Sequence, residues 1–128
     1  MRFFSIFIIA LSLVSCSKPT IAPEIATETH TSSNIDWKHK WDDSIFEEAK
    51  SQNKLIILSL EAIWCHWCHV MQAETYSDPQ VAKLLNDKFI SVSIDQNSNA
   101  GLSNRYKNYG WPATILFNSQ GREIVKRA

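Results

Sequence analysis

The sequence predicts one α/β domain in which a mixed sheet of about four strands is flanked by helices. Three observations support this: short runs rich in branched apolar residues, helical patterns that alternate with them, and a hairpin at the end. The 128 residues suit one domain and, at 45% hydrophobic, are too apolar for a disordered chain. Lys+Arg and Asp+Glu number 13 each, so no cationic face is indicated and nucleic acid is not an expected partner.

The first segment is expected to lie outside the fold. Arg2 precedes a short apolar stretch, which is well below the about 20 residues that a membrane-spanning helix needs and is typical of a secretory signal. The stretch ends in a Leu-Val-Ser-Cys string at Cys16, which resembles the lipobox of bacterial lipoproteins. We therefore expect residues 1–15 to be a lipoprotein signal peptide and Cys16 to be lipidated. An ordinary signal or anchor with an incidental Cys is the alternative.

Residues 16–36 are predicted to be the lipidated cysteine and a flexible tether, because they are rich in Thr, Ser and Pro and lack an amphipathic period. Several acyl chains on one Cys anchor a protein stably. The resemblance thus implies a lipid-anchored protein of the cell envelope that faces the periplasm. Ser17 follows the Cys, and the absence of Asp there favours the outer over the inner membrane in enterobacterial-type lipoproteins.

The folded module is predicted over residues 37–128, with Trp37 and Trp41 as packing residues. Helices are expected within 37–53 (capped by Asp42 or Asp43), over 65–74, from Pro79 after an Asp78 cap with Val81, Leu84 and Leu85 facing inward, and over 102–109. Strands are expected over 54–60, 88–95, 113–117 and 122–126. Helices between strands call for parallel crossovers, and the last two strands form an antiparallel hairpin. A further covering helix is missing after Arg127, so we expect a truncated sequence.

The chemistry is expected where the 54–60 strand meets the next helix. Cys65 and Cys68 form a Cys-x-x-Cys pair there. Free N–H groups and the dipole at a helix N-terminus stabilise a thiolate, so Cys65 is the expected nucleophile toward a substrate disulfide. Cys68 lies one turn further in, within disulfide distance, and is expected to resolve the mixed disulfide by forming the Cys65–Cys68 disulfide. His66 adjoins the nucleophile and, when protonated, adds a second positive influence.

Two other interpretations of these residues stay open. The string CHWCH at residues 65–69 is also the signature of c-type haem attachment, which predicts a mainly helical domain with His69 as an axial ligand. The strands predicted before the motif and after Pro112 argue against haem. Zinc held by the two cysteines and a His such as His39 is the third interpretation, but a second ligand pair is missing. We expect no cofactor and no metal.

The chain also carries Gly110-Trp111-Pro112 just before the 113–117 strand. A strand, a helix that opens with Trp64 and Cys-x-x-Cys, and an X-Pro before the next strand resemble the thioredoxin-like fold. That resemblance implies a cis bond before Pro112 that faces the disulfide, and a Trp111 backbone that pairs with an extended substrate chain. A trans Pro that merely starts a strand is the alternative, since most X-Pro bonds are trans.

More narrowly, the string CHWCHVM at residues 65–71 resembles a thioredoxin-like subfamily that includes the spermatogenesis-associated proteins. The membrane-side reductase domains of the thiol-disulfide interchange family share its plan. The resemblance implies an exported thiol-disulfide oxidoreductase with a reductase or repair role, supplied by a membrane redox partner and acting on protein or peptide thiols and disulfides. A peptide-binding module without turnover, gripping through Trp64, Trp67 and Trp111, is the alternative, and the direction of electron flow stays open.

The chain departs from thioredoxins at two places. Thioredoxins carry Gly-Pro between the cysteines, where this chain has His66 and Trp67. They also carry a buried acid six positions before the nucleophile, where this chain has Ser59. Glu61 is nearby but is expected to point elsewhere because the strand alternates. The proton acceptor for Cys68 therefore stays open, with Glu61 and His69 as candidates.

Overall fold

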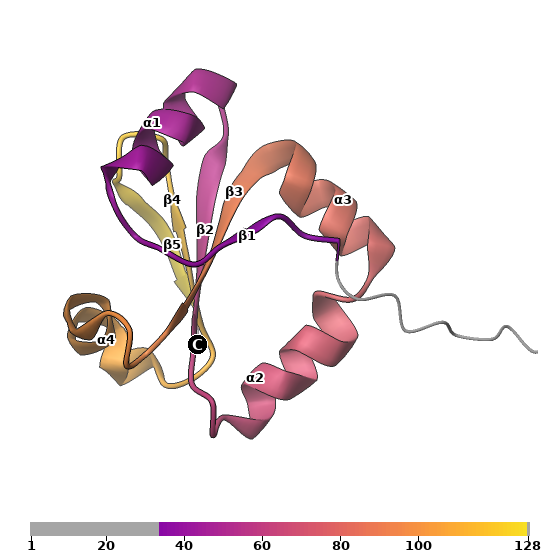
Figure 1. Cartoon of the computed structure of the whole chain (residues 1–128), viewed down its shortest axis with the longest axis vertical. Coiled ribbons are helices and arrows are strands. Elements are labelled where there is room, and N and C mark those ends of the chain that lie inside the picture. The colour runs from indigo at the N-terminus through magenta and orange to yellow at the C-terminus, as the bar shows by residue number, and fades with distance from the viewer. Residues whose placement is uncertain (1–33, 128) are drawn as a thin grey trace, which may run out of the picture.

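A computed structural model describes residues 34–127, which form a five-stranded sheet with helices packed on it (Figure 1). The predicted signal peptide, Cys16 and most of the predicted tether lie outside the described residues. Within the described part of the chain, no helix is long and apolar enough to cross a membrane. The predicted α/β, thioredoxin-like class is confirmed.

Each predicted helix and strand is present, with ends shifted by a few residues. The strands are β1 (Trp37–Lys38), β2 (Leu55–Glu61), β3 (Phe89–Asp95), β4 (Ala113–Phe117) and β5 (Glu123–Arg127). The helices are α1 (Asp43–Gln52), α2 (His66–Val70), the π-helical η1 (Met71–Thr75), α3 (Pro79–Lys88), α4 (Ala100–Tyr106) and the 3-10 turn η2 (Lys107–Tyr109). Asp42 caps α1 and Asp78 caps α3 through their carboxylates, as residues of this type do at helix N-termini. The short edge strand β1 was not predicted.

The sheet order is β1-β3-β2-β4-β5, and the direction of β4 corrects one prediction. β2 and β3 are parallel, as the crossover between them requires, but β4 is antiparallel to β2. The helix between β3 and β4 is too short for a crossover: the seven residues of α4 rise about 10 Å, whereas a seven-residue strand such as β3 spans about 23 Å. The chain therefore enters β4 at the end of the sheet where β3 finishes.

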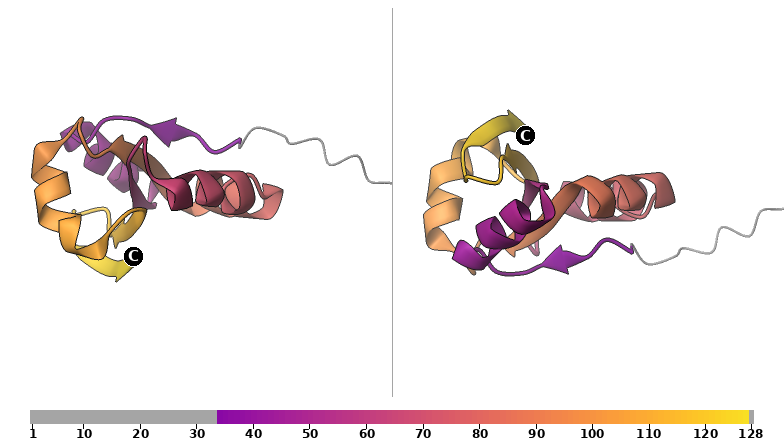
Figure 2. Two further views of the ribbon diagram at one scale, coloured as in Figure 1. Left: turned by 90° about the horizontal axis from the view of Figure 1, so that it is seen from below. Right: turned by 90° about the horizontal axis from the view of Figure 1, so that it is seen from above.

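Helices lie on both faces of the sheet (Figure 2). An apolar cluster on each face holds them there. α1 and α4 pack on one face of β2 and β3. α3 packs on the other face through Ala82 and Leu85, with Val81 partly buried. The prediction that Leu84 faces inward is wrong: it is 54% exposed, because the buried stripe of α3 runs through Ala82 and Leu85. Trp37 and Trp41 pack against the two clusters, as predicted.

The folded part begins before the predicted boundary at residue 37. Ile35, placed in the tether by its composition, is buried beside α3. The amide of Asn86 donates to the Asn34 carbonyl at 2.7 Å and accepts from the Asp36 N–H at 3.0 Å. Residues 34–36 therefore belong to the domain, because one side chain of α3 satisfies their backbone.

Candidate functional site

The β2–α2 junction brings the two cysteines to the start of a helix. Cys65 is the N-cap of α2, and its Sγ accepts from the Cys68 N–H at 3.1 Å. The loop before it is closed by a hydrogen bond from the Cys65 N–H to the Ala62 carbonyl at 2.9 Å. Because an α-helix has about 3.6 residues per turn, the Cys-x-x-Cys spacing puts Cys68 on the same side of the helix as Cys65, about one turn further along. The Cys65 sulfur thus lies where the free N–H groups of a helix point.

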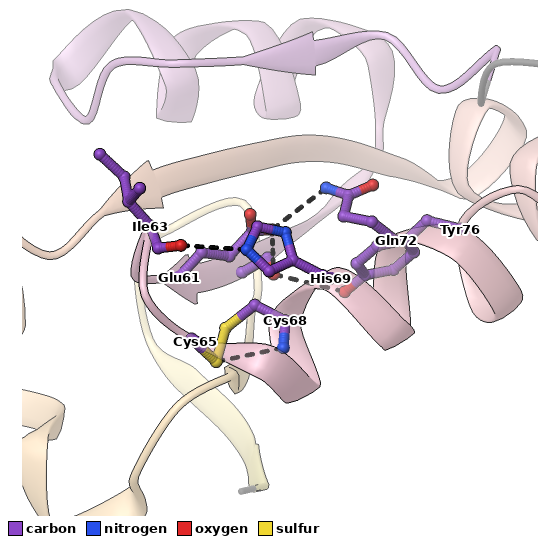
Figure 3. Close-up of a disulfide and its surroundings, with 8 residues drawn as sticks. Glu61, Ile63, Cys65, Cys68, His69, Gln72 and Tyr76 are labelled. Atoms are coloured by element: carbon purple, nitrogen blue, oxygen red, sulfur yellow. Dashed lines mark hydrogen bonds between the residues drawn. A yellow bond between two sulfur atoms is a disulfide. The ribbon is translucent and has the colours of Figure 1, made fainter.

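Cys65 and Cys68 are joined in a disulfide, with their Cα atoms 5.3 Å apart (Figure 3). That separation is ordinary for a disulfide. Both residues are nearly covered, at 4% and 3% exposure, and form a small cluster with Ala62. The disulfide is therefore largely shielded from bulk water.

The segment before β4 packs against this cluster. The peptide bond between Trp111 and Pro112 is cis. Trp111 lies against the cluster formed by Ala62 and the two cysteines. Gly110 has a φ of 74°, in the region that favours glycine, and lets the chain turn from η2 into this segment. The fold thus brings Trp111 and the disulfide together from residues far apart in the sequence.

Large apolar side chains stand exposed on the loop and the helix that carry the disulfide. Ile63 is 78% exposed, and Trp64 and Trp67 are 67% exposed each. The ring of His66 is also exposed and packs edge-on to Trp67, with centroids 5.3 Å apart. Exposed apolar groups gathered around a shielded reactive bond are suited to contact with another polypeptide.

Behind the disulfide, Glu61 lies on the same side of β2 as Ser59, the position where thioredoxins carry a buried acid. The expectation that Glu61 points elsewhere is therefore wrong. Residues two apart in a strand share a face, so Glu61 and Ser59 project to the same side. The Ser59 hydroxyl donates to Glu61 Oε1 at 3.0 Å, and Gln72 Nε2 donates to the same oxygen at 3.3 Å (Figure 3). The Tyr76 hydroxyl donates to Ser59 Oγ at 3.5 Å.

Sequence reasoning missed Gln72 and Tyr76 as parts of this network. Gln72 lies one helical turn after Cys68, which was an available signal. Tyr76 directly follows η1 and was not expected to face the site. Burial raises the pKa of Tyr76, so its hydroxyl keeps its proton and acts as a donor at neutral pH.

A cavity of about 420 Å³ opens beside Cys68, on the side of this network. The residues that line it include His39, Glu61, Cys68, His69, Ser93 and Asp95. His69 Nε2 lies 3.0 Å from the Ile63 carbonyl, and a carbonyl only accepts, so that nitrogen carries the proton. His69 therefore holds the loop before the cysteines as well as lining the cavity.

The haem and zinc interpretations find little support in this arrangement. The described residues form a five-stranded sheet, whereas the haem interpretation predicts a mainly helical domain. Among residues 34–127, no group of three or more His, Cys, Asp or Glu side chains is placed to hold a metal ion. His39, the other His considered for zinc, instead contacts the Ser93 carbonyl at 3.2 Å through Nδ1.

The fold and the Cys65–Cys68 pair place the chain in the thioredoxin-like class of proteins. Within that class, it belongs to the DsbH-type thioredoxin family, described as "Protein of unknown function, DUF255", whose profile matches residues 25–127. The predicted resemblance to a thioredoxin-like subfamily is thereby confirmed.

Individual relatives agree with this assignment. Spermatogenesis-associated protein 20 of Rattus norvegicus is 32% identical over 94 residues, which cover 67% of this chain and 12% of that protein. Thiol:disulfide interchange protein DsbD of Citrobacter koseri is 28% identical over 128 residues, covering 96% of this chain and 22% of that protein. The structure of a DsbH oxidoreductase superimposes with a TM-score of 0.64 at 18% identity, covering 93% of this chain and 83% of that one. The chain thus spans a minor part of its longer relatives.

Proposed function

We propose that the chain is an exported, membrane-tethered thiol-disulfide oxidoreductase with a reductase or repair role. The observation that carries this proposal is the Cys65–Cys68 disulfide at the start of α2, packed against Trp111 of the cis Trp111–Pro112 segment. The likeness to a thiol:disulfide interchange protein supports the thiol-disulfide chemistry, and the direction of electron flow is part of the proposal. A membrane redox partner would return the disulfide to the dithiol.

In the proposed reaction, the Cys65 thiolate attacks one sulfur of a substrate disulfide. A bond forms between Cys65 and that sulfur, and the other substrate sulfur leaves as a thiolate. Cys68 then loses its proton and attacks the Cys65 sulfur, which releases the second substrate thiolate and closes the Cys65–Cys68 disulfide. The substrate gains two electrons and, with two protons from the medium, becomes a dithiol, while the enzyme is oxidised by two electrons.

The substrate we propose is an extended segment of a protein or peptide. The exposed side chains of Ile63, Trp64 and Trp67 offer apolar contact beside a disulfide that is too shielded to meet a client without such docking. In this proposal the Trp111 backbone pairs with the client chain next to Pro112. His66 supports the Cys65 thiolate when it is protonated.

We also propose where the protein acts. The lipobox-like string at Cys16 supports a lipid anchor, and several acyl chains would give stable attachment. We place the enzyme on the periplasmic side of the cell envelope, at the outer membrane. Mass spectrometry of the protein isolated from the membrane tests this, because lipidation requires a diacylglyceryl-modified Cys16 as the first residue. An unmodified peptide that continues through Cys16 contradicts it.

The redox activity is tested by insulin reduction with the wild type and a Cys68→Ser variant. We expect turnover by the wild type and a trapped mixed disulfide on Cys65 in the variant. Peptide binding that survives the loss of both cysteines, without turnover in the wild type, would instead identify a binding module. A reduction potential well above about −150 mV would identify an oxidase rather than a reductase.

A further inference from the structure

Polar side chains line the sheet face beneath α2 and η1. The register of β2 and β3 pairs Ser59 with Ser93 and Glu61 with Asp95, and paired residues of a parallel sheet project to the same face. Ser59 is fully buried and Ser93 is 9% exposed. Burying hydroxyl groups costs free energy unless they are hydrogen-bonded, so this polar strip is a costly replacement for an apolar core.

The hydrogen bonds of the strip run in one direction. Tyr76 keeps its proton and donates to Ser59, so the Ser59 hydroxyl is free to donate onward to Glu61. The Gln72 amide N–H group is a donor only and also ends on Glu61 Oε1. Glu61 is therefore the acceptor on which this network converges, and the bonds found among the described residues leave its Oε2 without a donor.

The cavity beside Cys68 connects these groups to the thiol side of the site. Glu61 and Cys68 both line it, which places a carboxylate in the same cavity as the resolving cysteine. Three other titratable groups face this space: His39 after β1, Asp95 at the end of β3, and His69 of α2. Each is held by a structural bond, His39 to the Ser93 carbonyl, His69 to the Ile63 carbonyl and Asp95 to the Asn97 N–H.

We propose that Glu61 is the proton acceptor for Cys68 in the resolving step, with the cavity as the route by which the proton reaches solvent. The Cys68 S–H bond breaks, its proton passes across the cavity to Glu61 Oε2, and the electron pair stays on the Cys68 sulfur. That sulfur then attacks Cys65 and expels the substrate thiolate. The protonated Glu61 returns its proton to water. This inference rests on the proposed function.

The two chemical steps can be followed separately with dithionitrobenzoate, an aromatic disulfide that releases a coloured thiolate at each step. In the reduced full-length chain, attack by Cys65 releases the first equivalent and attack by Cys68 releases the second. We expect Glu61→Gln to leave the first release within about twofold and to slow the second about 10²-fold at neutral pH. The difference in second-release rate between the wild type and Glu61→Gln should shrink as the pH rises, because Cys68 then ionises without a base. Glu61→Asp should recover part of the rate.

Two matched variants show whether the effect belongs to Glu61. Asp95→Asn removes a carboxylate charge from the same cavity but keeps the oxygen that accepts from Asn97, and Glu74→Gln removes one from the exposed side of η1. Both should change the second release less than about threefold. Far-ultraviolet circular dichroism shows whether each variant is folded. If Glu61→Gln does not fold, the pH dependence of the second release in Glu61→Asp tests the role of Glu61 instead.

The outcomes separate this inference from the proposed function. A wild type that releases neither equivalent and does not reduce insulin removes the proposed function. In a second outcome, the wild type turns over while Glu61→Gln, or Glu61→Asp if Glu61→Gln does not fold, makes the second release at the wild-type rate at every pH. That result rules out the role of Glu61 and leaves the proposed function standing. An equal loss in Asp95→Asn would show a general effect of charge in the cavity and would also overturn the assignment.

Discussion

The two faces of β2 and β3 are built from the same strands but serve different ends. Toward α1 and α4 both strands present only apolar side chains, among them Leu58, Leu60 and Val92, all fully buried. Toward α2 and α3, β2 presents Ile57 before the polar residues Ser59 and Glu61, whereas β3 is polar from Ser91 onward. Alternation along a strand lets one segment supply a dry core on one side and a hydrogen-bonded network on the other.

The apolar face should carry most of the stability. We expect Leu58→Ala to lower the free energy of unfolding by about 2–5 kcal/mol, because it removes buried methyl groups and leaves a cavity. Denaturant titration of the oxidised full-length chain measures this. The matched control is Leu84→Ala on the exposed side of α3, which should cost about 0.5 kcal/mol or less. A similar loss of unfolding free energy in both variants would contradict the view that the face toward α1 and α4 carries most of the stability.

On the polar face, the loss of a single hydrogen bond should measurably lower the stability of the fold. We expect Ser59→Ala to lower the free energy of unfolding by about 1–2 kcal/mol, because it removes a donor to Glu61 and an acceptor for Tyr76. Ser91→Ala is the control, since the Ser91 hydroxyl is buried and makes no hydrogen bond within the described residues. That variant should be neutral or slightly stabilising. Denaturant titration that ranks Ser91→Ala as the more damaging change would contradict this view of the strip.

Each face also holds a tyrosine with a raised pKa, which gives the smallest expected effect. Burial is the first cause at Tyr76 and at Tyr106, and hydrogen bonding to Glu123 adds to it at Tyr106. The folded state therefore holds these protons more tightly than the unfolded chain, in which a tyrosine pKa is about 10. The resulting stability is complete below that pH and is lost as the pH rises through the folded pKa.

We accordingly expect the free energy of unfolding to fall above about pH 10 and to fall less steeply in Tyr76→Phe and Tyr106→Phe. Denaturant titrations at a series of alkaline pH values provide the measurement. Since the hydroxyl of Tyr76 bonds to Ser59 and that of Tyr106 to Glu123, the variants test one face each. Slopes equal to that of the wild type in both variants would show that these tyrosines are not responsible.

The fold and the cysteine pair were predictable because their signals are local. Branched apolar runs, capping residues and the Cys-x-x-Cys spacing each depend on a few neighbouring residues, and all reappear in the structure. The direction of β4 was mispredicted because it depends on the length of α4 relative to β3, which the order of elements does not convey. The surroundings of Cys68 were harder, since Tyr76 reaches Ser59 across the gap between a helix and the sheet. The side of the sheet that Glu61 faces follows from the two-residue period of β2, which puts it on the same face as Ser59.

The double hydrogen bond of the Asn86 amide has a mechanical consequence. It fixes the point at which the chain enters the domain to α3, a helix that carries neither cysteine. Tension applied to the chain ahead of Asn34 is borne first by that amide and by the pairing of β1 with β3. The Asn86 contact and the Cys65–Cys68 bond belong to separate elements, α3 and the start of α2.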